Sequence, residues 1–109
     1  MNDRELLESA AKAAGVPQDC YRFGIGGMWQ YTPQDGYFGA CWDPLANDGD
    51  ALRLAVTLDI RFSQKANGGE YCCAGLTFEP GSVFVEYRGT DPFAATRRAI
   101  VRAAAAMAT

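Results

Sequence analysis

The spacing of apolar residues changes several times along the chain, and each change predicts a new element. Over residues 2–14, apolar side chains from Leu6 to Ala14 recur at helical spacing, while charged side chains fall on the opposite side. Asn2 or Asp3 can cap the start of this helix, and Gly15 can end it. We therefore expect an amphipathic surface helix.

Aromatic residues separated by turn formers dominate residues 20–42. Aromatic side chains favour strands, and the glycines at positions 26 and 27, like the segment 32–36, are typical of turns. This stretch predicts two or three short strands that pair as an antiparallel meander.

A further pattern begins at residue 43, where four oxygen-bearing side chains precede an apolar run: Asp43, Asn47, Asp48 and Asp50. Asn47 or Asp48 can cap a helix, and Asp50 then lies in the first turn, where the helix dipole favours negative charge. A calcium loop of the EF-hand type needs alternating acidic residues and a glutamate at the twelfth position, which this stretch lacks. The cluster therefore predicts the start of a helix over residues 48–58.

The apolar arc of this helix is unusually wide, because only Asp50, Arg53 and Thr57 remain for contact with water. Two explanations are open. Either the helix is deeply buried, or part of its apolar side is a self-association surface.

Residues 58–64, 70–78 and 82–89 predict three more strands, with turns around residues 67–69 and 79–82. Val83, Val85 and Tyr87 share one face, and Arg61 and Glu86 are expected on other faces than their apolar neighbours. These strands form a second antiparallel meander.

The last periodic segment covers residues 90–107. Thr90 or Asp91 can cap a helix whose first residue is Pro92. The predicted apolar face of this helix consists of Phe93, Thr96, Ile100, Ala103, Ala104 and Met107. Arg98 and Arg102 are expected on the opposite face, with Arg97 at the boundary.

The predicted order is helix, two or three strands, helix, three strands, helix. Hairpin connections imply antiparallel pairing, so the helices should gather on sheet faces in an α+β layered sandwich instead of a doubly wound fold. A length of 109 residues is typical of a single domain, and no internal repeat is present. We therefore predict one domain over residues 1–109.

Composition limits the possible partners. The net charge of −3 supplies no long-range attraction for a polyanion, so nucleic-acid binding is disfavoured. Charged residues between Asp3 and Lys12 interrupt the apolar core that a signal peptide needs, and no stretch approaches the roughly 18 apolar residues of a membrane span. We expect a cytoplasmic protein without membrane contact.

The chain contains no histidine. This excludes Ser-His-Asp and Cys-His nucleophilic catalysis and most catalytic zinc sites, so an enzyme would have to use carboxylates, Lys, Tyr or Cys. The four cysteines, Cys20, Cys41, Cys72 and Cys73, lack the short spacing of zinc ligands and are expected to be thiols. The glycines of residues 24–27 precede a strand, whereas a phosphate loop precedes a helix. No catalytic residue, metal or cofactor is predicted.

The blocks "MNDRELLE", "WDPLANDGDALRLAV" and "DPFAATRRAIVRAAA" together resemble the phage ABA sandwich domain, a family of small bacteriophage and prophage proteins. The resemblance covers the beginning, middle and end of the chain. It implies a three-layer α/β/α sandwich, an origin in a phage or prophage, and a location in the bacterial host's cytoplasm. It carries no known activity, cofactor or site residue.

Two groups of residues are candidates for an interaction surface. Arg97, Arg98 and Arg102 form a basic cluster that is either a solvated helix face or a contact for phosphate or an acidic partner. Trp29 and Tyr31 belong to an aromatic group that could stack on bases, although cross-strand packing explains such residues more often.

The leading hypothesis for function is a non-enzymatic phage accessory protein that acts through protein contacts, with an unknown partner or a second copy of itself. The first alternative is a nucleic-acid-associated regulator that uses the arginine cluster. The second is an enzyme based on carboxylates or cysteine, which the sequence supports least because nothing in it brings two carboxylates to the spacing that a glycosidase needs.

Overall fold

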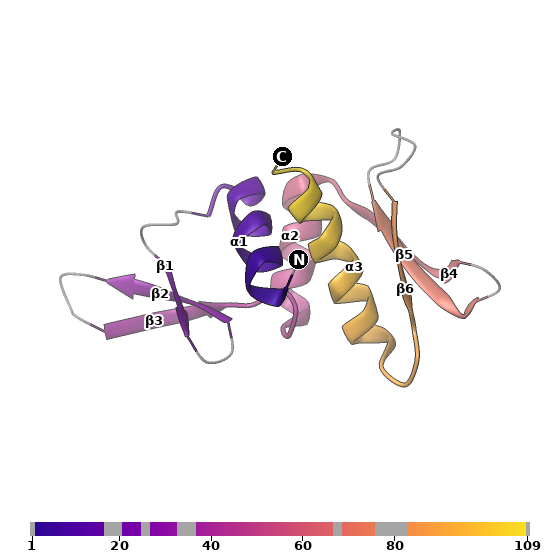
Figure 1. The fold of residues 1–109 in the computed structure, drawn as a ribbon, viewed down its shortest axis with the longest axis horizontal. Coiled ribbons are helices and arrows are strands. Elements are labelled where there is room, and N and C mark those ends of the chain that lie inside the picture. Colours follow the sequence, from indigo (N-terminus) through magenta and orange to yellow (C-terminus); the bar gives the residue numbers. More distant parts are fainter. Residues whose placement is uncertain are drawn as a thin grey trace.

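A computed structural model of the chain describes residues 2–16, 21–24, 27–32, 37–66, 69–75 and 83–108. The side chains of residues 21–24, 27–32, 37–41 and 65–66 lie outside this description. The described part contains three helices and two antiparallel three-stranded sheets (Figure 1). In chain order the elements are α1 (Asp3–Ala14), β1 (Tyr21–Gly24), β2 (Gly27–Thr32), β3 (Tyr37–Trp42), α2 (Asp48–Leu58), β4 (Arg61–Ala66), β5 (Tyr71–Gly75), β6 (Val83–Tyr87) and α3 (Pro92–Ala106).

The polar residues before each helix act as the predicted caps. The side-chain oxygens of Asn2, Asn47 and Asp91 each accept a hydrogen bond from the backbone N–H three residues later, at 2.8, 2.8 and 3.0 Å. Each bond satisfies a donor that the first helical turn leaves without a partner. At the end of α1, Gly15 adopts a left-handed conformation with φ of 76°, which a residue with a side chain rarely adopts.

The prediction of two antiparallel meanders is confirmed. Strands β1, β2 and β3 pair in sequence order to form the N-terminal sheet, and β4, β5 and β6 do the same in the C-terminal sheet. Strand β5 ends at Gly75, so the rest of the strand expected over residues 70–78 lies outside the described residues. The turns expected around residues 26, 32–36, 67–68 and 79–82 lie largely or wholly outside them as well.

The α+β class is confirmed, but the predicted α/β/α layer order is not. The three helices lie between the two sheets (Figure 1). Helix α3 packs against β5 and β6 on one side and against α1 and α2 on the other. The reason is that each meander forms its own sheet, whereas an α/β/α sandwich needs one sheet between two helix layers.

Small side chains allow α1 and α3 to pack closely. Ala10 of α1 and Ala104 of α3 have no exposed area, and both belong to the main core cluster. Larger side chains fill the rest of this core, including Leu54, Ile100 and Val101. The core is therefore formed mainly between helices and on the face of the C-terminal sheet that α3 covers.

The predicted apolar face of the last helix is partly wrong. Ile100, Ala103 and Ala104 are buried, but Phe93 is 67% exposed and Met107 is 36% exposed. Both lie at the ends of α3, beyond the neighbours that cover its middle.

Among the described residues, no helix is long and apolar enough to cross a membrane.

Candidate functional site

Helix α2 exposes part of its wide apolar arc. Ala51, Leu54 and Ala55 are buried in the core, whereas Leu52 is 54% exposed and Val56 is 73% exposed. Leu52 and Val56 are four residues apart and therefore share one side of the helix. Of the two explanations for the arc, deep burial of the whole helix is excluded.

Leu52 lines a groove of about 380 Å³ between α2, α3 and β4. Residues from three elements and from the connection before α3 form its walls. They are Asp48, Ala51 and Leu52 of α2, Phe62 and Gln64 of β4, Arg88, and Pro92, Phe93, Thr96, Arg97 and Ile100 of α3. A volume of this size lies within the range of ordinary ligand pockets.

Three large apolar side chains make this groove unusual for a protein surface. Phe93 is 67% exposed, Leu52 54% and Phe62 45%, and they come from different elements. Single exposed apolar residues are common, but a group that converges on one concave surface is typical of an interaction site. The groove can bury apolar side chains of a binding partner.

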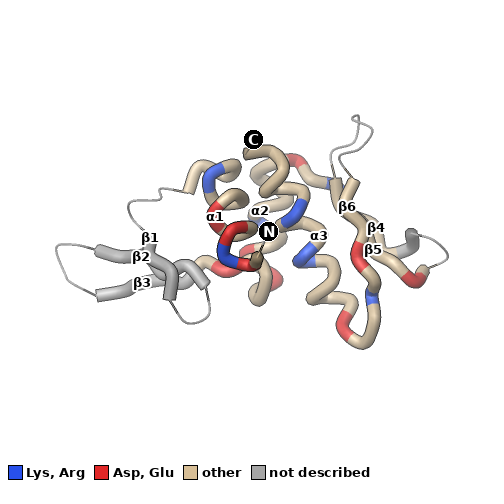
Figure 2. Tube along the Cα trace, viewed as in Figure 1, with Lys and Arg blue, Asp and Glu red and all other residues tan. Residues whose placement is uncertain are grey.

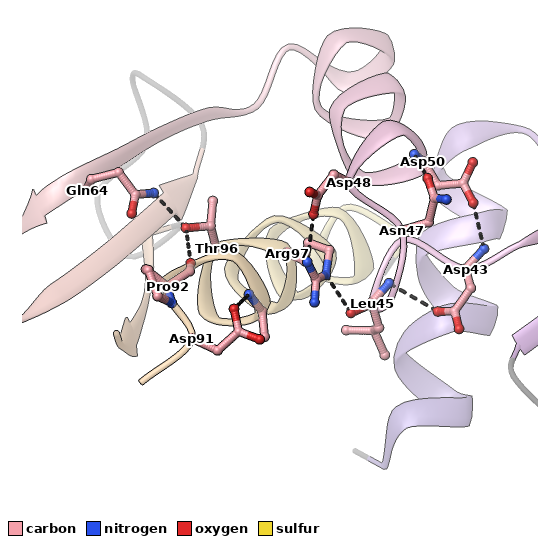
Figure 3. Close-up of polar contacts among 11 residues, drawn as sticks. Asp43, Leu45, Asn47, Asp48, Asp50, Gln64, Asp91, Pro92, Thr96 and Arg97 are labelled. Atoms are coloured by element: carbon pink, nitrogen blue, oxygen red, sulfur yellow. Dashed lines mark hydrogen bonds and ion pairs between the residues drawn. The ribbon is translucent and has the colours of Figure 1, made fainter. Parts of the chain in front are cut away.

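Hydrogen bonds beside the groove link α3 to the start of α2 and to β4. Arg97 of α3 donates from Nε to the backbone oxygen of Leu45 at 2.8 Å and from a terminal nitrogen to Asp48 at 2.6 Å (Figure 3). On the β4 side, Gln64 donates to the hydroxyl of Thr96 at 2.6 Å, and this hydroxyl donates to the oxygen of Pro92 at 2.7 Å. These bonds fix α2 and β4 relative to α3.

Arg88 lines the same groove just after β6. One of its terminal nitrogens donates to the backbone oxygen of Gly69 at 3.2 Å. Its Nε is buried and has no hydrogen-bond partner in the described part of the chain. A buried donor without a partner is uncommon in proteins, so Arg88 leaves hydrogen-bonding capacity unused beside the groove.

The arginines of the basic cluster form ion pairs with carboxylates of the same chain. Arg98 lies 2.9 Å from Asp3 and 3.8 Å from Glu86, and Arg102 pairs with Glu86 and lies over the ring of Phe84. Figure 2 shows acidic and basic segments interspersed over these elements. Because carboxylates compensate these arginines, the cluster offers less charge to a phosphate than its sequence suggests.

Arg98, Arg102 and Glu86 also line a second cleft, of about 390 Å³, between α1, β6 and α3. Its charged side chains are already paired with one another, as described above. The cleft therefore offers a weaker basis for ligand binding than the apolar groove does.

The aromatic candidates lie at the other end of the molecule. Trp29 and Tyr31 belong to β2, where Trp29 is opposite Cys41 and Tyr31 is opposite Phe38, with an irregular register between them. Their side chains lie outside the description, and β2 is not part of the groove. The structure thus does not bring Trp29 and Tyr31 together with the arginine cluster.

The acidic cluster before α2 forms a network of caps. Asp43 accepts from the N–H of Leu45 at 3.1 Å, and the N–H of Asp43 donates to Asp50 at 3.0 Å (Figure 3). The other carboxylate oxygen of Asp50 pairs with Arg53 at 2.7 Å. Among the residues that the structure describes, no group of three or more Cys, Asp or Glu side chains could hold a metal ion.

Burial raises the pKa of the Asp43 carboxyl above its ordinary value of 3.8, and the charges of Asp50 and Asp3 raise it further, although backbone hydrogen bonds oppose the shift. The folded state therefore binds the proton more tightly than the unfolded chain does. Protonation of Asp43 therefore raises the free energy of unfolding at low pH. This gain in stability is lost as the pH rises through the raised pKa.

We accordingly expect Asp43→Asn to be more stable than the wild type at pH 7, because the amide oxygen can still accept from Leu45 without a buried charge. The difference should shrink as the pH falls through the raised pKa of Asp43, because the folded wild type then also loses the charge at this position. Urea unfolding between pH 4 and 7 measures this, with exposed Glu70→Gln as the control. A variant less stable than the wild type throughout would show that the charge of Asp43 is required.

The two adjacent cysteines of β5 differ in burial, because neighbouring residues of a strand point to opposite faces. Cys72 is fully buried, Cys73 is half-buried, and both are free thiols. Cys20 and the side chain of Cys41 lie outside the description.

Sequence reasoning missed the groove, although two signals pointed toward it. The first signal was the wide apolar arc of α2, to which Leu52 belongs. Phe93 directly follows the first helical residue, Pro92, where a helix has few neighbours to cover it. No sequence signal indicated that Phe62 and Arg88 would join them, because both depend on how the C-terminal sheet packs on α3.

Comparison of this chain with models of protein families, with curated proteins and with solved structures found no match.

Proposed function

We propose that this protein is a non-enzymatic binding protein that acts through protein contacts and uses the apolar groove between α2, α3 and β4 as its binding surface. The observation that carries the proposal is the convergence of Leu52, Phe62 and Phe93, all at least 45% exposed, on one groove. Burying apolar area is the main favourable contribution to protein association. The groove has the composition that such contacts require.

The chemistry of the described residues supports binding over catalysis. The arginines of α3 are paired with carboxylates, and Asp43 and Asp50 each accept a hydrogen bond from a backbone N–H near the start of α2. The sequence offers no histidine as a general base. These arginines and carboxylates thus already have structural partners.

The proposal includes an origin in a phage or prophage and a site of action in the cytoplasm of the bacterial host. Its support is the resemblance of three sequence blocks to the phage ABA sandwich domain. Neighbouring genes for phage proteins are the expected finding. A gene far from any phage region would argue against this part of the proposal.

A charge placed in the groove should weaken partner binding. In Leu52→Glu, the carboxylate would have to leave water when a partner covers the groove, and we expect affinity to fall at least tenfold, or by about 1.4 kcal/mol. The protein would be immobilised, retained bacterial proteins identified and purified, and each affinity measured by calorimetry.

Val85→Glu is the matched control, because Val85 is 43% exposed but lies on the sheet face away from α3 and does not line the groove. Its affinity should stay within about twofold of wild type, since surface substitutions away from an interface have small effects. Circular dichroism checks that both variants fold. Equal affinities for Leu52→Glu and wild type would refute the groove as the binding surface.

A second copy of the chain is an alternative partner for Leu52 and Val56. A specific dimer needs an interface of about 1,000 Å² or more in total. Light scattering across a concentration series distinguishes this case, since a monomer at high concentration leaves only a different protein as partner.

A further inference from the structure

The open edge of the C-terminal sheet lies directly beside the groove. Strand β4 is at one edge of this sheet, because the strand order is β4-β5-β6. Phe62 and Gln64 of β4 also line the groove. Within the described part of the chain, the backbone groups at this edge are therefore available to whatever occupies the groove.

The alternation of backbone hydrogen bonds along the strands shows which backbone groups of β4 face the open edge of the sheet. The N–H of Arg88 donates to the backbone oxygen of Glu70 at 3.0 Å, so the backbone groups of Glu70 face the side of strand β6. Alternate residues of a strand direct their backbone groups to the same side, so the N–H and C=O groups of Cys72 and Ala74 in β5 also face β6. The backbone N–H and C=O groups of Cys73 and Gly75 then face β4, where their partners are Ser63 and Arg61.

Phe62, between these two partners, turns its N–H and C=O to the open edge, and Gln64 follows at the start of the register irregularity. In the described part of the chain, neither residue makes a backbone hydrogen bond outside the sheet. Exposed donors and acceptors on a strand edge are a template for pairing with another strand.

The opposite edge of the sheet is protected in a way that β4 is not. Val85 of β6 faces that edge, and its backbone oxygen accepts from Arg102 at 3.2 Å. The guanidinium group of Arg102 thus covers the middle of β6, and a strand could pair there only after displacing it. Of the two edges of the C-terminal sheet, the edge at Phe62 is the one that the described residues leave accessible for pairing.

We propose that the groove binds an extended segment of a partner protein, which pairs with β4 as a fourth strand of the C-terminal sheet. Figure 3 shows Gln64 of β4 bonded to Thr96 and Asp48 of α2 bonded to Arg97, and such a segment would lie between β4 and α2, along α3. Alternate side chains of the segment would point toward α3 and be buried among Leu52, Phe62 and Ile100.

This proposal rests on the proposed function and specifies the chemistry of the partner. The segment is short, because the register of β4 becomes irregular after Ser63. It carries an aliphatic or aromatic side chain at alternate positions, and it has no proline opposite Phe62, since the pairing needs an N–H donor there. An amphipathic helix would fill the groove with side chains but leave the backbone of Phe62 unpaired.

A pair of synthetic peptides tests the backbone pairing. The first is acetyl-Thr-Val-Thr-Phe-Thr-Val-Thr-amide, and the second is identical except for a methyl group on the backbone nitrogen of its phenylalanine. The methyl group removes the donor to the oxygen of Phe62 while keeping every side chain. Binding is measured by NMR titration and by amide hydrogen exchange of the ¹⁵N-labelled protein.

We expect the first peptide to bind, to slow exchange of the Phe62 amide at least tenfold at saturation, and to bind at least tenfold more tightly than the methylated peptide. The Ser63 amide is an internal control, because its sheet bond to Cys73 protects it without peptide. Leu52→Glu should weaken binding and Val85→Glu should not.

Equal binding of the two peptides, or binding without protection of Phe62, overturns strand pairing but leaves groove binding intact. Absence of binding by both peptides overturns strand pairing as well. The proposed function fails separately, if Leu52→Glu leaves the affinity for the identified partner protein unchanged.

Discussion

Leu54→Ala should lower the free energy of unfolding by about 2–5 kcal/mol, whereas Leu52→Ala, on the same helix, should lower it by only about 0.5 kcal/mol. Leu54 is 3% exposed and lies in the main core cluster, so its truncation leaves a cavity among close-packed neighbours. Leu52 is 54% exposed, and its truncation mainly widens the groove.

Chemical denaturation measures both values under one condition, and the two variants control for each other because the residue type and the helix are the same. Leu52→Ala should in addition weaken partner binding, since it removes apolar area from the groove. Two equal and large losses of stability would show that α2 is buried on both sides, contrary to the exposed arc.

Arg97→Met should destabilise the protein by about 1.5–3 kcal/mol, the range for hydrogen bonds that involve a charged group. The side chain of Arg97 is only 16% exposed, and it bonds both the backbone oxygen of Leu45 and the carboxylate of Asp48. Its loss leaves the oxygen of Leu45 without this donor. Most of the effect should come from that oxygen, because Asp48 is largely exposed and can return to water.

Arg4→Met is the matched control, because Arg4 also pairs with a carboxylate, Glu8 at 3.1 Å, but both side chains are well exposed. Its effect should stay within about 0.5 kcal/mol, as for other exposed ion pairs. Thermal unfolding at low and at high salt separates the two cases further, since screening weakens the exposed pair more. An equally small effect of Arg97→Met would mean that the contact between α3 and the residues before α2 contributes little.

Local elements could be predicted from the sequence because their causes are local. The caps at Asn2, Asn47 and Asp91 each act on a backbone N–H three residues away. Gly15 ends α1 because glycine readily adopts a positive φ. Strand pairing within each meander also follows from short connections between neighbouring strands.

The environment of charged side chains could not be predicted in the same way. Glu86 alternates with apolar residues in β6, and periodicity placed it on another face than Val83, Val85 and Tyr87. The structure turns Glu86 toward the arginines of α3 and leaves the three apolar side chains 43–67% exposed. Alternation separates the two faces of a strand, but it does not say which face the helix covers.

By itself, the sequence determined the order of helices and strands, their caps, the antiparallel pairing and the absence of histidine chemistry. Each of these depends on residue type and on neighbours within a few positions. Only the tertiary structure decided that the helices lie between two separate sheets, and that Leu52, Phe62 and Phe93 meet in one groove. These features depend on packing between segments far apart in the chain, which no local pattern encodes.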